Sequence, residues 1–216
     1  DKINSLNQTK VLNKITSNFI GNSRLPMLII DKKHISNNNF DARYAGITGF
    51  SMFGKDISYA LNENMEVDFK AVNFFLEKYK KNTFLIFGFT SIVWENFFEK
   101  LIKHKFKNKF DNGILIHGGG WKRLKNKKIT NKIFKRNLKK NLNIKNFINY
   151  YGMVEQTGSI FFECSKGFFH CSIFSDIIIR DRNFSVCKNN QVGIIQVLSL
   201  IPTSYPGNSI LSEDKG

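Results

Sequence analysis

Cysteine is scarce in this sequence, with three among 216 residues: Cys164, Cys171 and Cys187. Three cysteines cannot all pair within one chain, and no secretory hydrophobic segment opens the sequence, so we expect a reducing compartment rather than a disulfide-rich secreted domain. No apolar run reaches the length that crosses a bilayer. We therefore expect a cytoplasmic protein without a membrane span.

Signatures of the common nucleic-acid and phosphate binders are also missing. The sequence has no zinc-finger spacing, no arginine-rich arm and no aromatic ladder in a basic strand. The glycines of residues 42–60 lack the lysine and hydroxyl residue of a Walker loop, so we assign no phosphate binding there. We expect a loop, either beside a ligand or irregular at the surface. A net charge of +16 ordinarily suggests an anionic partner, but the lysines accompany an excess of Asn, Ile and Phe. Apart from the run 122–145 they are spread out, so we expect composition bias and no nucleic-acid partner.

With 42% hydrophobic residues, the chain can bury a core of one domain or part of one. From residue 26 to 150, apolar runs of strand length alternate with stretches of helical spacing. We expect strands at 26–31, 83–87, 113–117 and 147–149, and helices at 1–20, 68–80, from Thr90 or Ser91 onward, and within 122–145. This alternation is typical of an α/β fold, a mostly parallel sheet flanked by helices.

After Glu155 the pattern changes to short strands separated by turns. We expect these strands at 159–163, 168–174, 176–180 and 192–200. They predict a β-rich subdomain packed beside the main sheet. The expected organisation is therefore an α/β core over residues 1–158 and a β-rich subdomain over residues 159–216.

The stretch Tyr150-Tyr151-Gly152-Met153-Val154-Glu155 has the composition of a binding site. It joins an aromatic pair, a glycine that permits a sharp turn, and a carboxylate at the end of a short apolar strand. Open α/β sheets bind ligands at such strand ends. Upstream, Gly118, Gly119 and Gly120 follow another strand and let a backbone approach a flat ligand closely, although a flexible strand-to-helix turn would look the same.

These residues resemble a known family. Three motifs occur in the order found in LuxE-type acyl-protein synthetases: HGGGWK, YGMVEQTGSIFFEC and SYPGNSILSEDKG. The LuxE-type proteins are relatives of phenylacetate-CoA ligase in the adenylate-forming superfamily. The resemblance implies ATP-dependent activation of a carboxylic acid, a fatty acid in the LuxE type, as an acyl-adenylate. It also implies transfer of the acyl group to a protein thiol or similar acceptor, with an acceptor protein or reductase as partner and with ATP and magnesium as cofactors.

The resemblance also implies roles for individual residues. Glu155 would bind magnesium as the catalytic carboxylate, Tyr151 beside Gly152 would stack on adenine, and Asp214 would hydrogen-bond the ribose hydroxyls. The loop Gly118–Gly120 would pack against adenine, and Gln156 would contact the acyl-phosphate end. Val154 stands where many relatives have a hydroxyl residue that donates to the α-phosphate, so Thr157 or a backbone amide would take its place.

Cys164 and His170 join two expected strands at a spacing that could supply half of a zinc site. A buried free cysteine and a surface histidine would give the same pattern. In the resembled proteins a cysteine pair follows the equivalent of Gly216, which would complete such a site.

The phosphate loop and the catalytic lysine of the superfamily are not recognisable in the sequence. We therefore expect an internal piece of a larger enzyme. Two alternatives remain: a catalytically silent scaffold, and a nucleic-acid-binding module that uses the basic segment 122–145.

Overall fold

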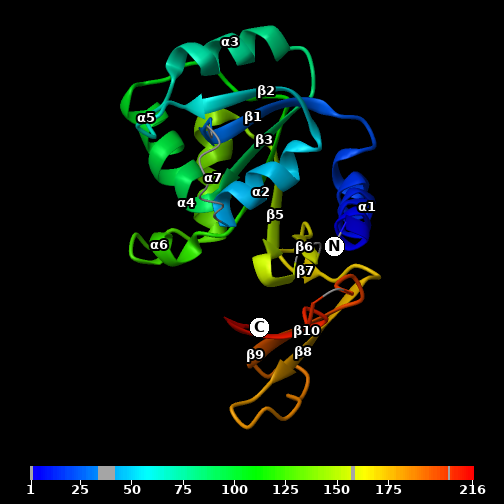
Figure 1. Ribbon diagram of the computed structural model, residues 1–216. Helices are drawn as coiled ribbons and strands as arrows, with labels where there is room; N and C mark the ends of the chain where they lie inside the picture. The colour runs from blue at the N-terminus through cyan, green and yellow to red at the C-terminus, as the bar shows by residue number, and fades with distance from the viewer. Residues whose placement is uncertain (1, 34–41, 157–158, 204) are drawn as a thin grey trace. The chain divides into compact units, whose positions relative to one another are not determined.

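The computed structural model describes residues 2–33, 42–156, 159–203 and 205–216. The chain forms two compact units, which are described separately (Figure 1). One unit is Ser23–Asn149, called the sheet unit below. The other combines Asp1–Asn22 with Tyr150–Gly216 and is called the terminal unit.

The sheet unit is built from strands that alternate with helices. Its elements are β1 (Leu25–Lys32), α2 (Ala42–Ser51), β2 (Gly54–Leu61), α3 (Phe69–Tyr79), β3 (Phe84–Phe89), α4 (Thr90–Ile92), η1 (Val93–Phe98), α5 (Glu99–Lys103), β4 (Gly113–Gly118), α6 (Trp121–Lys125), α7 (Asn131–Leu142) and the first part of β5 (Asn146–Gly152). Strands β2, β1, β3 and β4 pair in parallel in that order. Six of the eight residues of β1 are buried, because helices cover both faces of the sheet.

The two faces of this sheet are covered by different helices. On one face, Phe50 of α2 stacks on Phe87 of β3 with ring centroids 4.6 Å apart. On the other face, α3, the α4–α5 helix and α7 share one hydrophobic cluster with alternate residues of the strands. Figure 1 shows α2 in front of the sheet and α7 behind it. The parallel sheet with helices on both faces agrees with the expected fold class.

The helix expected from Thr90 onward is interrupted by a π-helical segment, Val93–Phe98. The backbone N–H of Glu99 donates to the carbonyl of Trp94, five residues earlier, which is the hydrogen-bond pattern of a π-helix. The indole Nε1 of Trp94 also donates to Oε1 of Glu99, at 2.8 Å. Apolar periodicity predicts a helix here but does not reveal a one-residue bulge.

Two expectations for the sheet unit are corrected. Residues 42–60 are not an irregular loop but contain α2 and most of β2, an edge strand that pairs in parallel with β1. Of the glycines that suggested a loop, Gly54 is explained by packing, since a Cβ there would come within 2.6 Å of the Met27 Sδ. The segment 122–145 holds two helices rather than one. Thr130 caps the second by accepting from the backbone N–H of Ile133 at 3.3 Å.

The terminal unit contains α1 (Lys2–Ile20), the end of β5, the 3-10 turn η2 (Val154–Gln156), and further strands. These strands are β6 (Ile160–Glu163), β7 (Phe169–His170), β8 (Ser175–Arg180), β9 (Ile194–Ser199) and β10 (Ser209–Lys215). Strands β6 and β7 extend the main sheet in antiparallel fashion, giving the order β2-β1-β3-β4-β5-β6-β7, and β10-β9-β8 form a separate antiparallel sheet. The β-rich character expected after Glu155 is confirmed. Strand β10 was not expected. The division at residue 158 stays a prediction.

Phe19 of α1 packs on Phe162 of β6 with ring centroids 4.6 Å apart. The first helix therefore joins the terminal unit although it is remote in sequence from the strands that it contacts. Among the residues that the structure describes, no helix is long and apolar enough to cross a membrane.

Candidate functional site

The glycine run follows β4 and leads into α6. Gly119 and Gly120 have φ angles of +64° and +74°, which side-chain-bearing residues adopt only with strain. A Cβ at Gly120 would lie 2.5 Å from the Ser91 Oγ at the start of α4, and one at Gly119 would lie 3.3 Å from the Phe89 ring. Packing within the sheet unit therefore accounts for both glycines, and their contact with adenine stays a prediction.

We expect the Gly120→Ala variant to be destabilised by about 2 kcal/mol or more, because it combines left-handed backbone strain with a steric clash. Urea denaturation measures the difference. Gly49→Ala is the matched control, since Gly49 lies in α2 and a Cβ there meets nothing within 4 Å. That change should be neutral or stabilising by up to about 1 kcal/mol. Equal effects of the two changes would contradict the packing argument.

His117, directly before the glycines, was not singled out from the sequence. It is fully buried, its Nδ1 lies 3.1 Å from the Oγ1 of Thr90, and its ring packs 4.7 Å from that of Phe134. Burial lowers the pKa of His117 to about 3, with a further contribution from the charge of Lys135. The neutral ring joins the start of α4 to the end of β4. The only available signal was a histidine ending an apolar strand.

The buried histidine should make folding stability depend on pH. The unfolded chain protonates His117 near pH 6.5, whereas the folded chain keeps it neutral down to about pH 3. Stability should therefore be highest above pH 6.5 and should fall by about 2 kcal/mol between pH 6.5 and 5. Denaturation of His117→Gln across this range should show a flatter profile. An unchanged slope in His117→Gln would contradict the assignment.

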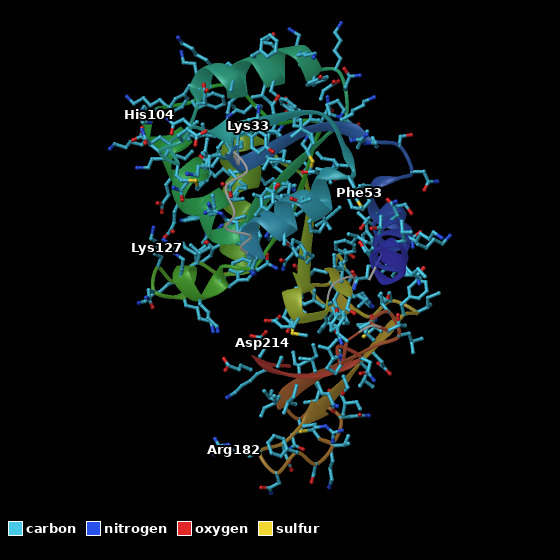
Figure 2. The ribbon with its side chains drawn as sticks, in the orientation of Figure 1. Lys33, Phe53, His104, Lys127, Arg182 and Asp214 are labelled. Atoms are coloured by element: carbon cyan, nitrogen blue, oxygen red, sulfur yellow. The ribbon has the colours of Figure 1, made fainter. Side chains whose placement is uncertain are left out.

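Tyr151 and Asp214 form a contact in the terminal unit across 63 positions of sequence. The Tyr151 hydroxyl donates to Asp214 Oδ2 at 2.9 Å. Tyr151 lies at the end of β5 and Asp214 in the outer strand β10, and Asp214 carries an exposed carboxylate (Figure 2). Partial burial, followed by the interaction with Asp214, raises the pKa of Tyr151 to about 12, so the phenol stays a hydrogen-bond donor at neutral pH. The structure thus brings together residues from two of the three motifs.

Gln156 anchors the turn η2, which follows Tyr151 in the chain. Its side chain is fully buried, and its Nε2 donates to the carbonyls of Val197 at 3.3 Å and Gly207 at 2.8 Å. These bonds connect the end of η2 to β9 and to the turn before β10. Both amide hydrogens are engaged in this arrangement, so contact with an acyl-phosphate, which needs a donor, would require their release. The contact of Gln156 with the acyl end stays a prediction.

Glu155 occupies the middle of η2, and its side chain is exposed while the neighbouring Gln156 is buried. Gly152, three residues earlier, ends β5 and is also exposed. Thr157, the proposed substitute phosphate donor, lies outside the described residues. The turn therefore presents one carboxylate to solvent on a support that is anchored by the buried amide of Gln156.

This arrangement fits a nucleotide with magnesium. Magnesium in nucleotide sites is commonly held by one or two carboxylates together with phosphate oxygens and water, so the single exposed carboxylate of Glu155 suffices from the protein side. Asp214 accepts from Tyr151 through Oδ2 and retains acceptor capacity for sugar hydroxyls. The aromatic face of Tyr151 is half-buried and can stack on a base.

Cys164 and His170 come together at the antiparallel pairing of β6 and β7. Hydrogen bonds from the Phe168 backbone and then from the His170 side chain lower the pKa of Cys164 to about 7. Within the described residues, no cluster of three or more metal-ligating side chains occurs. Cys164 and His170 are therefore two neighbouring side chains without a third ligand among the described residues, and a zinc site that includes them stays a prediction.

The sequence matches the family of LuxE acyl-protein synthetases over residues 1–216. The chain belongs to the LuxE acyl-protein synthetase family. A search of curated proteins finds no match to this LuxE-family chain.

Solved structures resemble the LuxE-family chain in fold. The amide bond synthetase McbA from Marinactinospora thermotolerans has 12% identity and a TM-score of 0.60, with 97% of this chain and 42% of McbA covered. ATP-bound MatB from Rhodopseudomonas palustris has 10% identity and a TM-score of 0.62, with 97% and 41% covered. The Klebsiella oxytoca NpsA N-terminal subdomain, in complex with 3-hydroxybenzoyl-AMSN, has 14% identity and a TM-score of 0.55, with 97% and 55% covered.

These neighbours are adenylate-forming enzymes, and their likeness places the fold of the LuxE-family chain with the N-terminal domain of that group. The chain spans about two fifths of the length of McbA and MatB. At this level of identity the likeness concerns the fold alone.

Proposed function

We propose that the LuxE-family chain takes part in the ATP-dependent activation of a carboxylic acid, a fatty acid in particular, as an acyl-adenylate that is passed to an acceptor protein thiol. The observation that carries the proposal is the hydrogen bond from Tyr151 to Asp214. It joins the motif after β5 to the motif at the chain's end, and family membership supports the nucleotide role of both.

In this proposal Tyr151 stacks on adenine, and its hydroxyl holds the Asp214 carboxylate in place. Asp214 accepts hydrogen bonds from the two ribose hydroxyls. These contacts orient the nucleotide before the reaction, which lowers the entropic part of the barrier.

The chemical step forms one bond and breaks one. A carboxylate oxygen of the acid attacks the α-phosphorus of ATP, the bond from that phosphorus to the bridging oxygen breaks, and pyrophosphate leaves. Magnesium, when bound, neutralises the charge of the phosphates. Glu155 holds the metal, and η2 fixes Glu155 in position through Gln156.

The printed descriptions of two neighbours favour a nucleotide and an acyl group at this fold. MatB was solved with ATP bound, and the NpsA N-terminal subdomain was solved with 3-hydroxybenzoyl-AMSN. NpsA also indicates that an N-terminal part of such an enzyme can hold a ligand of this kind by itself.

Binding of a hydrolysis-resistant acyl-adenylate tests the proposal directly. Calorimetric titration would compare a tetradecanoyl with an acetyl sulfamoyl-adenosine. We expect binding of both, tighter for the long chain, because a longer apolar chain buries more surface. Equal affinities would contradict the fatty-acid assignment, and absence of binding by a folded protein would contradict the adenylate site.

A further inference from the structure

Almost all of the net positive charge of the protein comes from one segment. Residues 100–145 hold 16 of the 33 basic residues and one of the 17 acidic residues, Asp111, and therefore carry a net charge of +15. The other 170 residues hold 17 basic and 16 acidic residues and are almost neutral. Composition bias spread over the whole chain does not produce such a distribution.

The elements of this segment contact one another within the sheet unit. Lys109, in the loop after α5, donates to the carbonyl of Asn141 near the end of α7, at 2.6 Å. Lys127, after α6, lies 3.3 Å from the Glu99 carboxylate at the start of α5. Helices α5, α6 and α7 and the loop after α5 are therefore neighbours within the sheet unit, and their exposed residues are called the basic face below. Figure 2 labels His104 and Lys127 on one side of the unit.

Most of the cations on the basic face lack an acidic partner. All 16 are exposed except Lys135, which is half-buried. In the described part of the chain, Arg123 and Lys127 pair with Glu95 or Glu99, and the other exposed cations of the segment have no carboxylate within 4.0 Å. Like charges on neighbouring elements repel one another and raise the energy of the isolated protein, so an anionic surface that covers them would be attracted strongly.

We propose that the basic face binds an anionic lipid bilayer. Each lysine or arginine near an anionic bilayer strengthens binding by about fivefold, and the effect decays within a Debye length. The unpaired cations of α7 are Lys132, Arg136, Lys139 and Lys140, on the side opposite its buried residues Phe134, Leu138 and Leu142. Such a helix can face a bilayer without exposing its core.

The composition of the basic face favours a bilayer over other anionic partners. The segment holds 14 lysines and two arginines, whereas planar recognition of phosphates in nucleic acids favours arginine. Its aromatic residues Phe106, Phe110, Trp121 and Phe134 belong to or pack on the hydrophobic cluster and do not present stacking faces for bases. Protein interfaces need an apolar centre, but Ile102 is the one large hydrophobic side chain exposed here among the described residues. Mobile lipid headgroups, in contrast, can rearrange around dispersed lysines.

Vesicle sedimentation tests the proposal with the chain as it is. Vesicles of phosphatidylcholine alone are compared with vesicles that contain 30% phosphatidylglycerol, at about 0.1 M salt, where the Debye length is about 10 Å. The test variant replaces four α7 cations by glutamine: Lys132→Gln, Arg136→Gln, Lys139→Gln and Lys140→Gln. The control makes the same change at four exposed lysines outside the basic face: Lys10→Gln, Lys55→Gln, Lys70→Gln and Lys81→Gln. Both variants have the same net charge, and circular dichroism checks their folding.

We expect binding to the anionic vesicles only, at least tenfold weaker for the α7 variant and within twofold of wild type for the control. Equal losses in the two variants would overturn the proposal, since net charge alone would then explain binding. Binding to duplex DNA without binding to vesicles would overturn it in favour of a nucleic acid. Competition by soluble glycerophosphoglycerol at the same headgroup concentration would assign a site for a free anion instead. Because the readout is sedimentation, failure here leaves the proposed adenylation untouched.

Discussion

Replacing Glu155 by glutamine is expected to lower carboxylate-dependent exchange of pyrophosphate into ATP by about 100-fold or more, because the change removes the anionic ligand proposed for magnesium. Loss of one group that stabilises charge in the transition state typically costs 10²–10³ in rate. The exchange is measured on the full reading frame that encodes this chain. Glutamine keeps the size of the side chain, so the 3-10 turn should remain intact.

Glu213→Gln is the matched control for this experiment. Glu213 is also exposed and lies in the terminal unit, next to Asp214. We expect less than a threefold change in exchange for the control. If Glu155→Gln retained exchange close to that of wild type, or if the control lost as much, Glu155 would not be the metal ligand.

Replacing Asp214 by alanine should weaken ATP binding by about 10- to 100-fold. The change removes the proposed acceptor for the ribose hydroxyls, and a hydrogen bond to a charged group contributes about 1.5–3 kcal/mol. It also leaves the hydroxyl of Tyr151 without its acceptor at 2.9 Å. Isothermal titration with ATP and magnesium measures the affinity.

Two further variants separate the contributions of this contact. Tyr151→Phe keeps the ring for stacking and loses only the hydroxyl that positions Asp214, so we expect a smaller loss, of about three- to tenfold. Asp176→Asn changes an exposed carboxylate of β8 in the same unit and should leave ATP affinity unchanged. A larger loss in Tyr151→Phe than in Asp214→Ala would contradict the assigned roles.

The sequence predicted most of the strands because each is a short apolar run with turn residues around it. Strands β1, β3 and β4 were expected within about two residues of their ends, and the buried face of α7, with Phe134, Leu138 and Leu142, was expected from helical spacing. Such patterns are local. An element buried on one face has apolar residues at regular spacing, and a strand buried on both faces is a continuous apolar run, so both can be recognised in the sequence.

Most of the features that were missed depend on contacts between distant parts of the chain. The glycines of residues 42–60 suggest a loop, but packing against neighbouring elements stabilises α2 and β2 there. Strand β10, SILSEDK, has four polar or charged residues in succession and gains its regularity by pairing with β9. The π-helical segment changes the register of a helix without changing its composition.

The candidate site divides in the same way. Tyr151, Glu155 and Asp214 could be named from motifs, but the hydrogen bond between Tyr151 and Asp214 could not, because they lie 63 positions apart in the sequence. The hydrogen bonds of the buried Gln156 side chain could not be predicted either, because its partners are backbone carbonyls, which every residue type has. The sequence does not distinguish His117 from other residues at strand ends, because its contact with Thr90 is made only in the folded structure.

The most direct test of the account is ATP–pyrophosphate exchange by the full reading frame over a panel of carboxylic acids, from acetate to tetradecanoate. The account predicts exchange that requires an acid and increases toward the long-chain acids. Absence of exchange with every acid, in a protein shown to be folded, would contradict the central claim that this LuxE-family protein activates carboxylates.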